Sequence, residues 1–393
     1  VNDCAPIQVF KTGAQVAAIF VYLPSAPVEG KQLKIVNVMR GANGTPIHLF
    51  SADRSGNGSA APILIIGAGQ SVDLCYSKDF ISRGSGGAAS ETGWVTLNFA
   101  PPSSTNYSSV VLGGENNKAS GSYASTVSGY NNTASGTYAT VLSGSSNTAS
   151  NTNAAVVGGS SNTASGSSSA VVGGSSSVAS GQNSFAGGGS SNAPSGSGSG
   201  ILGGINNLAS GQYAVVAGGN TNYANSANSA TIGGSYGTAR TIIGNYVTPA
   251  SNGPISTVNG VQQLATLLLA RQTTDATATR LTSNQSAAGT TNQVILPNDS
   301  AYYFRGSIVC GVTGAGDSSA WTFEGLIKRG ANAASTVIVQ SVVNLVGQNT
   351  GASTWVAAIS ADTTNGGLAV TVTGQASTTI RWVCKIETTE MAH

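Results

Sequence analysis

Short apolar runs recur along the middle of the chain at a spacing of 15 residues, and each run is followed by glycine. Runs such as Val156-Val157 and Ile201-Leu202 are rich in β-branched residues and predict short strands. Each closing glycine predicts a tight turn, because glycine accepts a positive φ. The nine glycines of this column are Gly114, Gly129, Gly144, Gly159, Gly174, Gly189, Gly204, Gly219 and Gly234. A 15-residue period is too short for a helix pair or a propeller blade, so it predicts one coil of a narrow parallel β-solenoid.

Two further columns of small residues keep the register of the glycines. Alanine stands five residues after each glycine, except at Pro194. Asparagine stands two residues before the alanine, except at Ser177 and Gly237. Asparagine suits tight corners because its side chain hydrogen-bonds the nearby backbone. These columns extend the predicted solenoid over residues 106–240.

The N-terminal part of the chain carries a different pattern. Residues 33–38 alternate apolar and polar side chains, and residues 63–66 form an apolar run bounded by glycine-rich segments. This pattern predicts a small β-sandwich-like domain over residues 1–105. Residues 241–262, which follow the repeats and contain two prolines, are predicted to be a neck or linker.

The C-terminal part again predicts strands. Residues 321–328 and 380–387 alternate in the manner of strands with one buried face. Asn365-Gly366, placed directly before an apolar run, is a hairpin signal. We therefore predict an antiparallel β-sandwich of jelly-roll type over residues 263–393 and an all-β fold for the whole chain.

Charge is scarce and excludes several classes of function. Charged residues are 8% of the 393 residues, against about 25% in ordinary domains. Residues 109–239 contain only Glu115 and Lys118, so the solenoid lacks the groups that acid–base or metal catalysis needs. The net charge of +2 comes without a basic run, which argues against nucleic-acid binding. The longest apolar stretch, residues 14–23, is too short to span a bilayer, and we predict no membrane insertion.

Candidate catalytic and metal-binding residues are few. The only histidines are His48 and His393. The acidic residues of the C-terminal part are spread along it and mostly flank turns; they are Asp275, Asp299, Asp317, Glu324, Asp362, Glu387 and Glu390. Asp317 and Asp362 offer oxygen ligands but lack the spacing of a calcium loop. We predict no enzymatic activity, no cofactor and no metal site, with paired carboxylates for hydrolysis as the alternative.

The four cysteines are divided between the two flanks: Cys4, Cys75, Cys310 and Cys384. None belongs to a CxxC or zinc pattern. Cys310 and Cys384 stand in strand-like runs and are predicted to be buried reduced thiols. A disulfide within each flank is the alternative.

The small size of each coil predicts self-association. A 15-residue coil with two or three small apolar side chains encloses too little volume for a self-sufficient core, so we expect a homotrimer. Tyr123, Tyr138 and Tyr213 share one repeat column. They predict a stacked surface or interface ladder first and a binding stripe second.

The repeats resemble the head repeats of trimeric bacterial adhesins of the YadA type. Residues 156–166, Val-Val-Gly-Gly-Ser-Ser-Asn-Thr-Ala-Ser-Gly, and their copies carry the resemblance over about residues 109–240. It implies a left-handed parallel β-roll with three chains packed side by side. The chain departs from the family at Gly187, Pro194 and Gly200, which predicts irregular coils near residues 185–200.

The C-terminal part resembles the C-terminal domain of tail fibre proteins from tailed phages. Residues 321–332, 361–366 and 379–382 carry this resemblance. It implies a trimeric virion tail fibre that contacts a host surface receptor, expected to be a glycan, without naming binding residues. The N-terminal domain would join other virion tail proteins, and the fibre would be assembled in the host cytoplasm and become extracellular in the mature virion.

The head of a bacterial trimeric autotransporter adhesin is the alternative function. Such a protein needs a heptad stalk and a membrane anchor, whereas residues 387–393 end this chain after a soluble-looking domain. The phage function is therefore favoured.

Aromatic rings are the candidate receptor-binding groups, because sugar faces stack on them. Trp321, Trp355 and Trp382 are the candidates in the C-terminal part. The competing interpretation places tryptophans of alternating strands in the core.

Overall fold

A computed structural model describes residues 109–393 except 252 and 315, together with the backbone of six strands in residues 1–108. These strands are β1 (Ile19–Tyr22), β2 (Gln32–Val36), β3 (Ile47–Phe50), β4 (Leu64–Ile66), β5 (Ser71–Tyr76) and β6 (Trp94–Thr96). They form two three-stranded sheets, ordered β1-β3-β4 and β2-β5-β6. The packing of their side chains, and with it the expected N-terminal sandwich, lies outside the described part of the chain, as do Cys4 and the side chains of His48 and Cys75.

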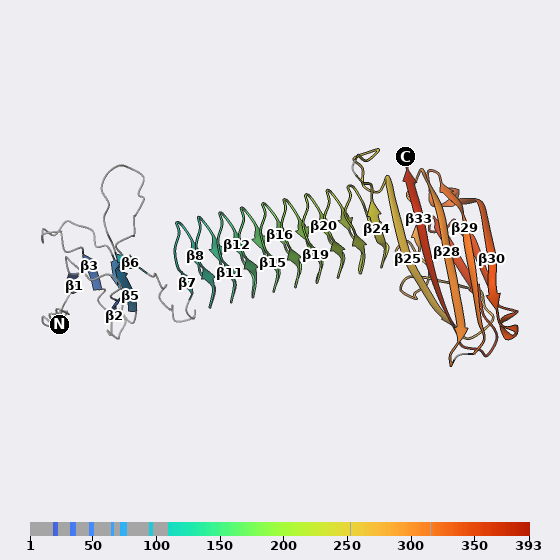
Figure 1. Cartoon of the computed structure of the whole chain (residues 1–393), viewed down its shortest axis with the longest axis horizontal. Coiled ribbons are helices and arrows are strands. Elements are labelled where there is room, and N and C mark those ends of the chain that lie inside the picture. Colours follow the sequence, from blue (N-terminus) through green and yellow to red (C-terminus); the bar gives the residue numbers. More distant parts are fainter. Residues whose placement is uncertain are drawn as a thin grey trace.

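The repeats form a parallel β-solenoid in which the strands of each coil lie beside those of the next (Figure 1). One row of strands is β7 (Val110–Val111), β9 (Ser125–Thr126), β11 (Thr140–Val141), β13 (Ala155–Val156), β15 (Ala170–Val171), β17 (Phe185–Ala186), β19 (Gly200–Ile201), β21 (Val215–Val216) and β23 (Ala230–Thr231). The other row is β8 (Lys118–Ala119), β10 (Thr133–Ala134), β12 (Thr148–Ala149), β14 (Thr163–Ala164), β16 (Val178–Ala179), β18 (Ala193–Pro194), β20 (Leu208–Ala209) and β22 (Tyr223–Ala224). Partners stand 15 residues apart, as Val156 and Val171 do. The predicted all-β fold and 15-residue coils are confirmed.

One row of the solenoid is interrupted at a single place. The sheet that contains β16 does not continue to β18, where Pro194 has no N–H to donate. In the other row, β17 and β19 pair in regular register even though Gly200 replaces a larger strand residue. The irregularity expected near residues 185–200 is thus confined, in the strand pairing, to the row of Pro194.

Glycine turns and buried asparagines hold each coil to the next. All nine glycines of the repeat column have φ between 62° and 99°, as the sequence predicted for the turns. Asn162 is fully buried, and its amide donates to the carbonyls of Gly158 and Gly174, each at 3.0 Å. Its side-chain oxygen accepts from the backbone N–H of Ser177 at 3.0 Å. The asparagine column is therefore a ladder that satisfies backbone groups inside the solenoid.

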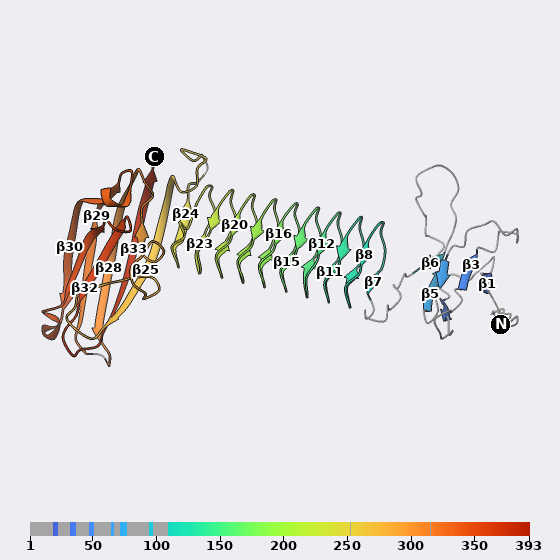
Figure 2. The same cartoon turned by 180° about the vertical axis from the view of Figure 1, so that it is seen from behind.

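The solenoid continues without a break into the C-terminal domain. Strand β24 (Tyr246–Pro249) pairs in parallel with β23 and antiparallel with β25 (Gln262–Thr273). As a result, one 15-stranded sheet runs from β7 through the solenoid to β30 (Val337–Gln348). Residues 241–262, for which the sequence indicated a neck, thus contribute a strand to this sheet. The C-terminal domain lies at one end of the solenoid (Figures 1 and 2).

The C-terminal domain consists of two antiparallel sheets around one core. The first sheet contains β25, β28 (Ser300–Val312), β29 (Ser318–Arg329), β30 and β33 (Ile380–Ala392). The second contains β26 (Thr279–Arg280), β27 (Val294–Ile295), β31 (Val356–Asp362) and β32 (Gly367–Thr373). Short 3-10 helices, η1 (Ala333–Ser335) and η2 (Thr350–Ala352), flank β30. Buried side chains of both sheets, such as Phe304 and Val370, belong to the same cluster.

Both C-terminal cysteines belong to this core. Cys310 and Cys384 are buried and free, which confirms the prediction of reduced thiols for these two residues. Burial raises the pKa of the Cys310 thiol to about 12 and raises that of Cys384 as well. Both side chains therefore act as small apolar groups rather than as nucleophiles.

Asp362 is a buried carboxylate at the end of β31, next to the turn at Asn365. It accepts hydrogen bonds from the side chains of Gln293 and Asn365, each at 2.7 Å, and forms an ion pair with Arg280. Burial opposes ionisation, but the hydrogen bonds from Asn365 and Gln293 and the charge of Arg280 outweigh it and lower the pKa of Asp362 to about 2. The carboxylate is thus a structural anchor of the hairpin rather than a free metal ligand.

Acid is expected to destabilise the C-terminal domain through Asp362. Its pKa is lower in the folded chain than the usual value of about 3.9, so its contribution is complete above pH 4 and disappears as the pH falls towards 2. The loss amounts to about 2 kcal/mol. Urea unfolding followed by tryptophan fluorescence between pH 5 and 2 measures it. Asp362→Asn should flatten this dependence, and an unchanged slope in that variant would assign the acid sensitivity to other groups.

Candidate functional site

The outward face of the large C-terminal sheet is the candidate functional surface. Alternate residues of β28 point into the core or outward, so Phe304 is fully buried while Tyr303 is exposed. The strand register places Tyr303 between Leu326 of β29 and Thr389 of β33. It also places Val309 beside Val383. Apolar side chains therefore lie in two separate rows across this face.

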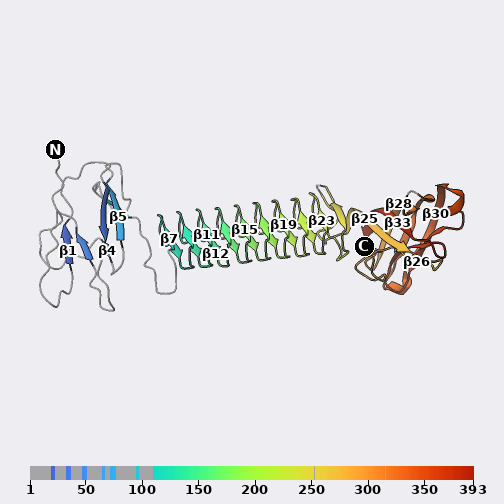
Figure 3. The ribbon, with the colours of Figure 1, turned by 90° about the horizontal axis from the view of Figure 1, so that it is seen from below.

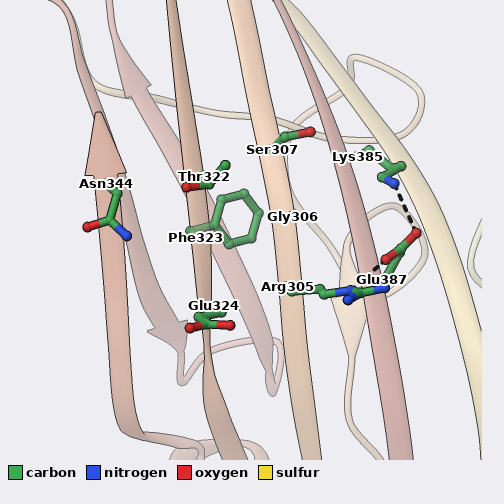
Figure 4. Close-up of a pocket in the computed structure, with 9 residues that line it drawn as sticks. All are labelled: Arg305, Gly306, Ser307, Thr322, Phe323, Glu324, Asn344, Lys385 and Glu387. Atoms are coloured by element: carbon green, nitrogen blue, oxygen red, sulfur yellow. Dashed lines mark hydrogen bonds and ion pairs between the residues drawn. The ribbon is translucent and has the colours of Figure 1, made fainter. Parts of the chain in front are cut away.

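A shallow hollow of about 450 Å³ lies between these rows. It is lined by Arg305, Gly306 and Ser307 of β28, Thr322, Phe323 and Glu324 of β29, Asn344 of β30, and Lys385 and Glu387 of β33 (Figure 4). All four strands are long members of one rigid sheet. The polar groups are consequently held by strand pairing rather than by loops.

Strand register explains how the charged residues meet. Arg305 stands opposite Glu324 on one side and Glu387 on the other. With neighbouring strands about 4.8 Å apart, the two glutamates belong to backbones separated by about 10 Å. The floor is closed by Phe323, whose buried ring packs against the core side of Gly306: a Cβ added to Gly306 would lie 2.3 Å from the ring. Gly306 is thus required for the flat packing of the aromatic ring beneath the hollow.

The charges in the hollow largely satisfy one another. Glu387 accepts from Arg305 at 2.7 Å and from Lys385 at 2.9 Å. The hydrogen bonds from Lys385 and Arg305 lower the pKa of Glu387. The Tyr303 hydroxyl donates to Glu324 at 2.9 Å, which raises the pKa of Tyr303. The hollow therefore presents a paired, mixed-charge surface, suited to hydroxyl groups or to a polar partner surface.

A second exposed feature runs along the solenoid. The residue that follows each strand of the β7–β23 row is often aliphatic and points outward; examples are Leu112, Leu142, Val157, Val172 and Leu202, between 41% and 61% exposed. We call this column the aliphatic ladder. In the sequence, the apolar pairs Val156-Val157 and Ile201-Leu202 predicted strands, but we did not predict which residue of each pair is buried and which is exposed. The alternation of side chains along a strand could have revealed the exposed column, because adjacent residues of a strand point to opposite sides.

The tryptophans predicted to contact a receptor belong to the core instead. Trp321, Trp355 and Trp382 are at most 6% exposed. Trp321 and Trp382 stack with ring centroids 6.0 Å apart, and Trp355 packs on Trp382 at 5.9 Å. The three rings fill the space between the two sheets, so no ring face is free for a sugar. The repeat tyrosines Tyr123 and Tyr138 do form the expected stack, with centroids 4.9 Å apart.

Other kinds of site find little support in the described residues. Within residues 109–393, apart from the two omitted positions, no group of three or more His, Cys, Asp and Glu side chains is arranged to hold a metal ion. In the same part of the chain, no helix has the length and apolarity needed to cross a membrane.

No protein family model and no curated protein sequence matches the chain. Similar solved structures are tailspike proteins of phages of Acinetobacter baumannii. That of phage AM24 is 9% identical, with 74% of this chain and 60% of that chain covered and a TM-score of 0.22. That of bacteriophage Fri1, named a capsular polysaccharide depolymerase, is 10% identical, with 72% and 62% covered and a TM-score of 0.22. This chain thus spans about three fifths of the length of either protein. The expectation of a protein without enzymatic activity is contradicted by the second of these structures.

Proposed function

We propose that the chain is a receptor-binding protein of a phage tail, in which three copies pack along the solenoid and the C-terminal domain contacts a glycan of the host surface. The observation that carries this proposal is a straight, nearly uncharged solenoid whose sheet continues into a terminal β-domain (Figure 3). Such a rod holds a binding domain at a distance from its attachment point. In this arrangement the N-terminal side joins the other virion tail proteins.

The aliphatic ladder supports the homotrimer. Large aliphatic side chains recur at this position in most coils, with neighbouring coils about 4.8 Å apart along the shaft; the exceptions are Gly187 and Ala217. The side chains of Leu112, Leu142, Val157, Val172 and Leu202 are exposed although they are large and apolar. A surface with this repeat is matched best by another copy of the same shaft. The scarcity of charge in residues 109–239 also means that packing two shafts requires little desolvation of ions.

Charge placed in the ladder should dissociate the assembly. We expect Val157→Lys combined with Val172→Lys to change the mass in light scattering from three chains to one, because each interface would bury unpaired ammonium groups. The matched control, Thr152→Lys with Ser180→Lys, adds the same charge at exposed positions outside the ladder and should leave the trimer intact. A parent chain that is already monomeric at micromolar concentration would refute the proposed assembly.

Receptor recognition is tested with the full-length chain. Fluorescently labelled protein should bind candidate host cells saturably and lose this binding when the cells lack their surface polysaccharide. The length of purified polysaccharide after incubation with the protein, measured by size-exclusion chromatography, shows whether binding is accompanied by cleavage. Equal binding to cells with and without polysaccharide would contradict a glycan receptor.

A further inference from the structure

We infer that the outward face of β25, β33 and β28 in the C-terminal domain is covered by a second copy of this chain, so that the hollow around Arg305 lies at a boundary between subunits. This inference rests on the proposed trimer and extends it from the shaft to the terminal domain. It also assigns the hollow to self-association rather than to the receptor.

The face has the composition of an interface core. Leu264 and Leu268 of β25 are 51% and 59% exposed, and Val309 of β28 is 58% exposed. Tyr303 and Val383 add further exposed apolar surface on the neighbouring strands. Isolated exposed apolar residues are ordinary, but a cluster on one face of one sheet marks an interaction surface.

Continuity of the sheet identifies the occupant. Tyr246 of β24 pairs with Ala230 of the last solenoid strand and with Thr266 of β25. Thr248, two residues further along β24, pairs with Leu264. β25 thus lies two strand spacings, or about 10 Å, from the last strand of the shaft row. A copy that covers the aliphatic ladder up to β23 therefore reaches Leu264 and Leu268 on the same face.

The charges on this face are compatible with such contact. The hollow on this face contains two carboxylates, Glu324 and Glu387, and two cations, Arg305 and Lys385. Arg305 and Lys385 already pair with Glu387. The one further charge on the outward side of β25, β28 and β33 is Arg381, which lies at the end of β33 far from the strand pairing of Leu264. Approach of the partner would exclude water from these pairs and strengthen them.

Cysteine labelling in the assembled full-length chain tests the inference. Leu268→Cys places a thiol on the face in question, and Ser360→Cys places a matched thiol at an exposed position of the second sheet. In the trimer, we expect maleimide to label Leu268→Cys about tenfold more slowly than Ser360→Cys, because a covered thiol is inaccessible. Labelling of the unmodified chain supplies the background of the native cysteines. Val309→Cys gives the same readout if Leu268→Cys fails to assemble.

The outcomes separate the inference from the proposed function. Slow labelling in a trimer supports both. Equal labelling of the two variants in a trimer would overturn the inference and leave the shaft assembly standing. A monomeric parent chain would overturn both, and slow labelling in that monomer would identify an occupant other than a second copy.

Discussion

Replacing Gly174 by alanine is expected to cost the shaft at least about 3 kcal/mol. Gly174 has a φ of +84°, and a Cβ added there would lie 2.1 Å from the carbonyl oxygen of Gly189 in the next coil. The obstructing atoms are backbone, which cannot move without breaking the contact between coils. We expect urea unfolding, followed by circular dichroism, to show this loss, with the solenoid separating into two weakly coupled segments.

The neighbouring glycine provides a matched control. Gly173 precedes Gly174 directly, and a Cβ added to it would meet nothing within 4 Å. Its φ lies outside the positive range where alanine is strained. Gly173→Ala should therefore leave the unfolding curve almost unchanged. If Gly173→Ala and Gly174→Ala destabilised the chain equally, glycine would be needed here for backbone flexibility and not for the geometry of the turn.

This contrast shows why the solenoid could be predicted from the sequence. Glycine at position 174 and asparagine at position 162 are required by contacts within one coil and with the coil next to it. The same requirement returns every 15 residues, so the sequence shows the glycine nine times and the asparagine seven times. Pro194 marks the one break in the strand ladder for an equally local reason, the missing N–H.

The candidate surface could not be predicted in the same way, because it depends on distant pairings. Arg305 and Glu387 are 82 residues apart in the chain and meet only through the pairing of β28 with β33. Neither residue stands in a motif. Trp382 likewise has the alternation of a strand, but the sequence does not say whether a second sheet covers its face.

The joint between shaft and terminal domain is a further long-range feature that the sequence does not reveal. Arg240 follows the last repeat, whereas Glu390 lies near the end of β33, 150 residues later. Their side chains form a buried ion pair at 2.9 Å, with 12% and 3% exposed. Gln263 of β25 donates to the same carboxylate at 2.8 Å. The Gln263 side chain also accepts a hydrogen bond from the backbone N–H of Thr238 at 2.9 Å and donates one to the carbonyl of Thr238 at 3.0 Å. This cluster pins the last coil to the terminal domain.

Removing the carboxylate should weaken that joint severely. Glu390→Ala leaves the guanidinium of Arg240 buried without its anion and deprives Gln263 of an acceptor. We expect a loss of about 3–5 kcal/mol, the range for breaking a buried ion pair by removing one partner. Thermal unfolding of the full chain measures the loss, and limited proteolysis should show new cleavage within residues 241–262.

The same strand supplies the control for this prediction. Glu387 pairs with two cations, but its side chain is 32% exposed, and exposed pairs add little to stability. Glu387→Ala should therefore destabilise the chain far less than Glu390→Ala. Combining Arg240→Met with Glu390→Leu should recover most of the loss, because apolar groups of similar size replace a buried ion pair at little cost. Failure of this double variant to recover stability would show that the ion pair sets the docking geometry of the last coil, beyond neutralising a buried charge.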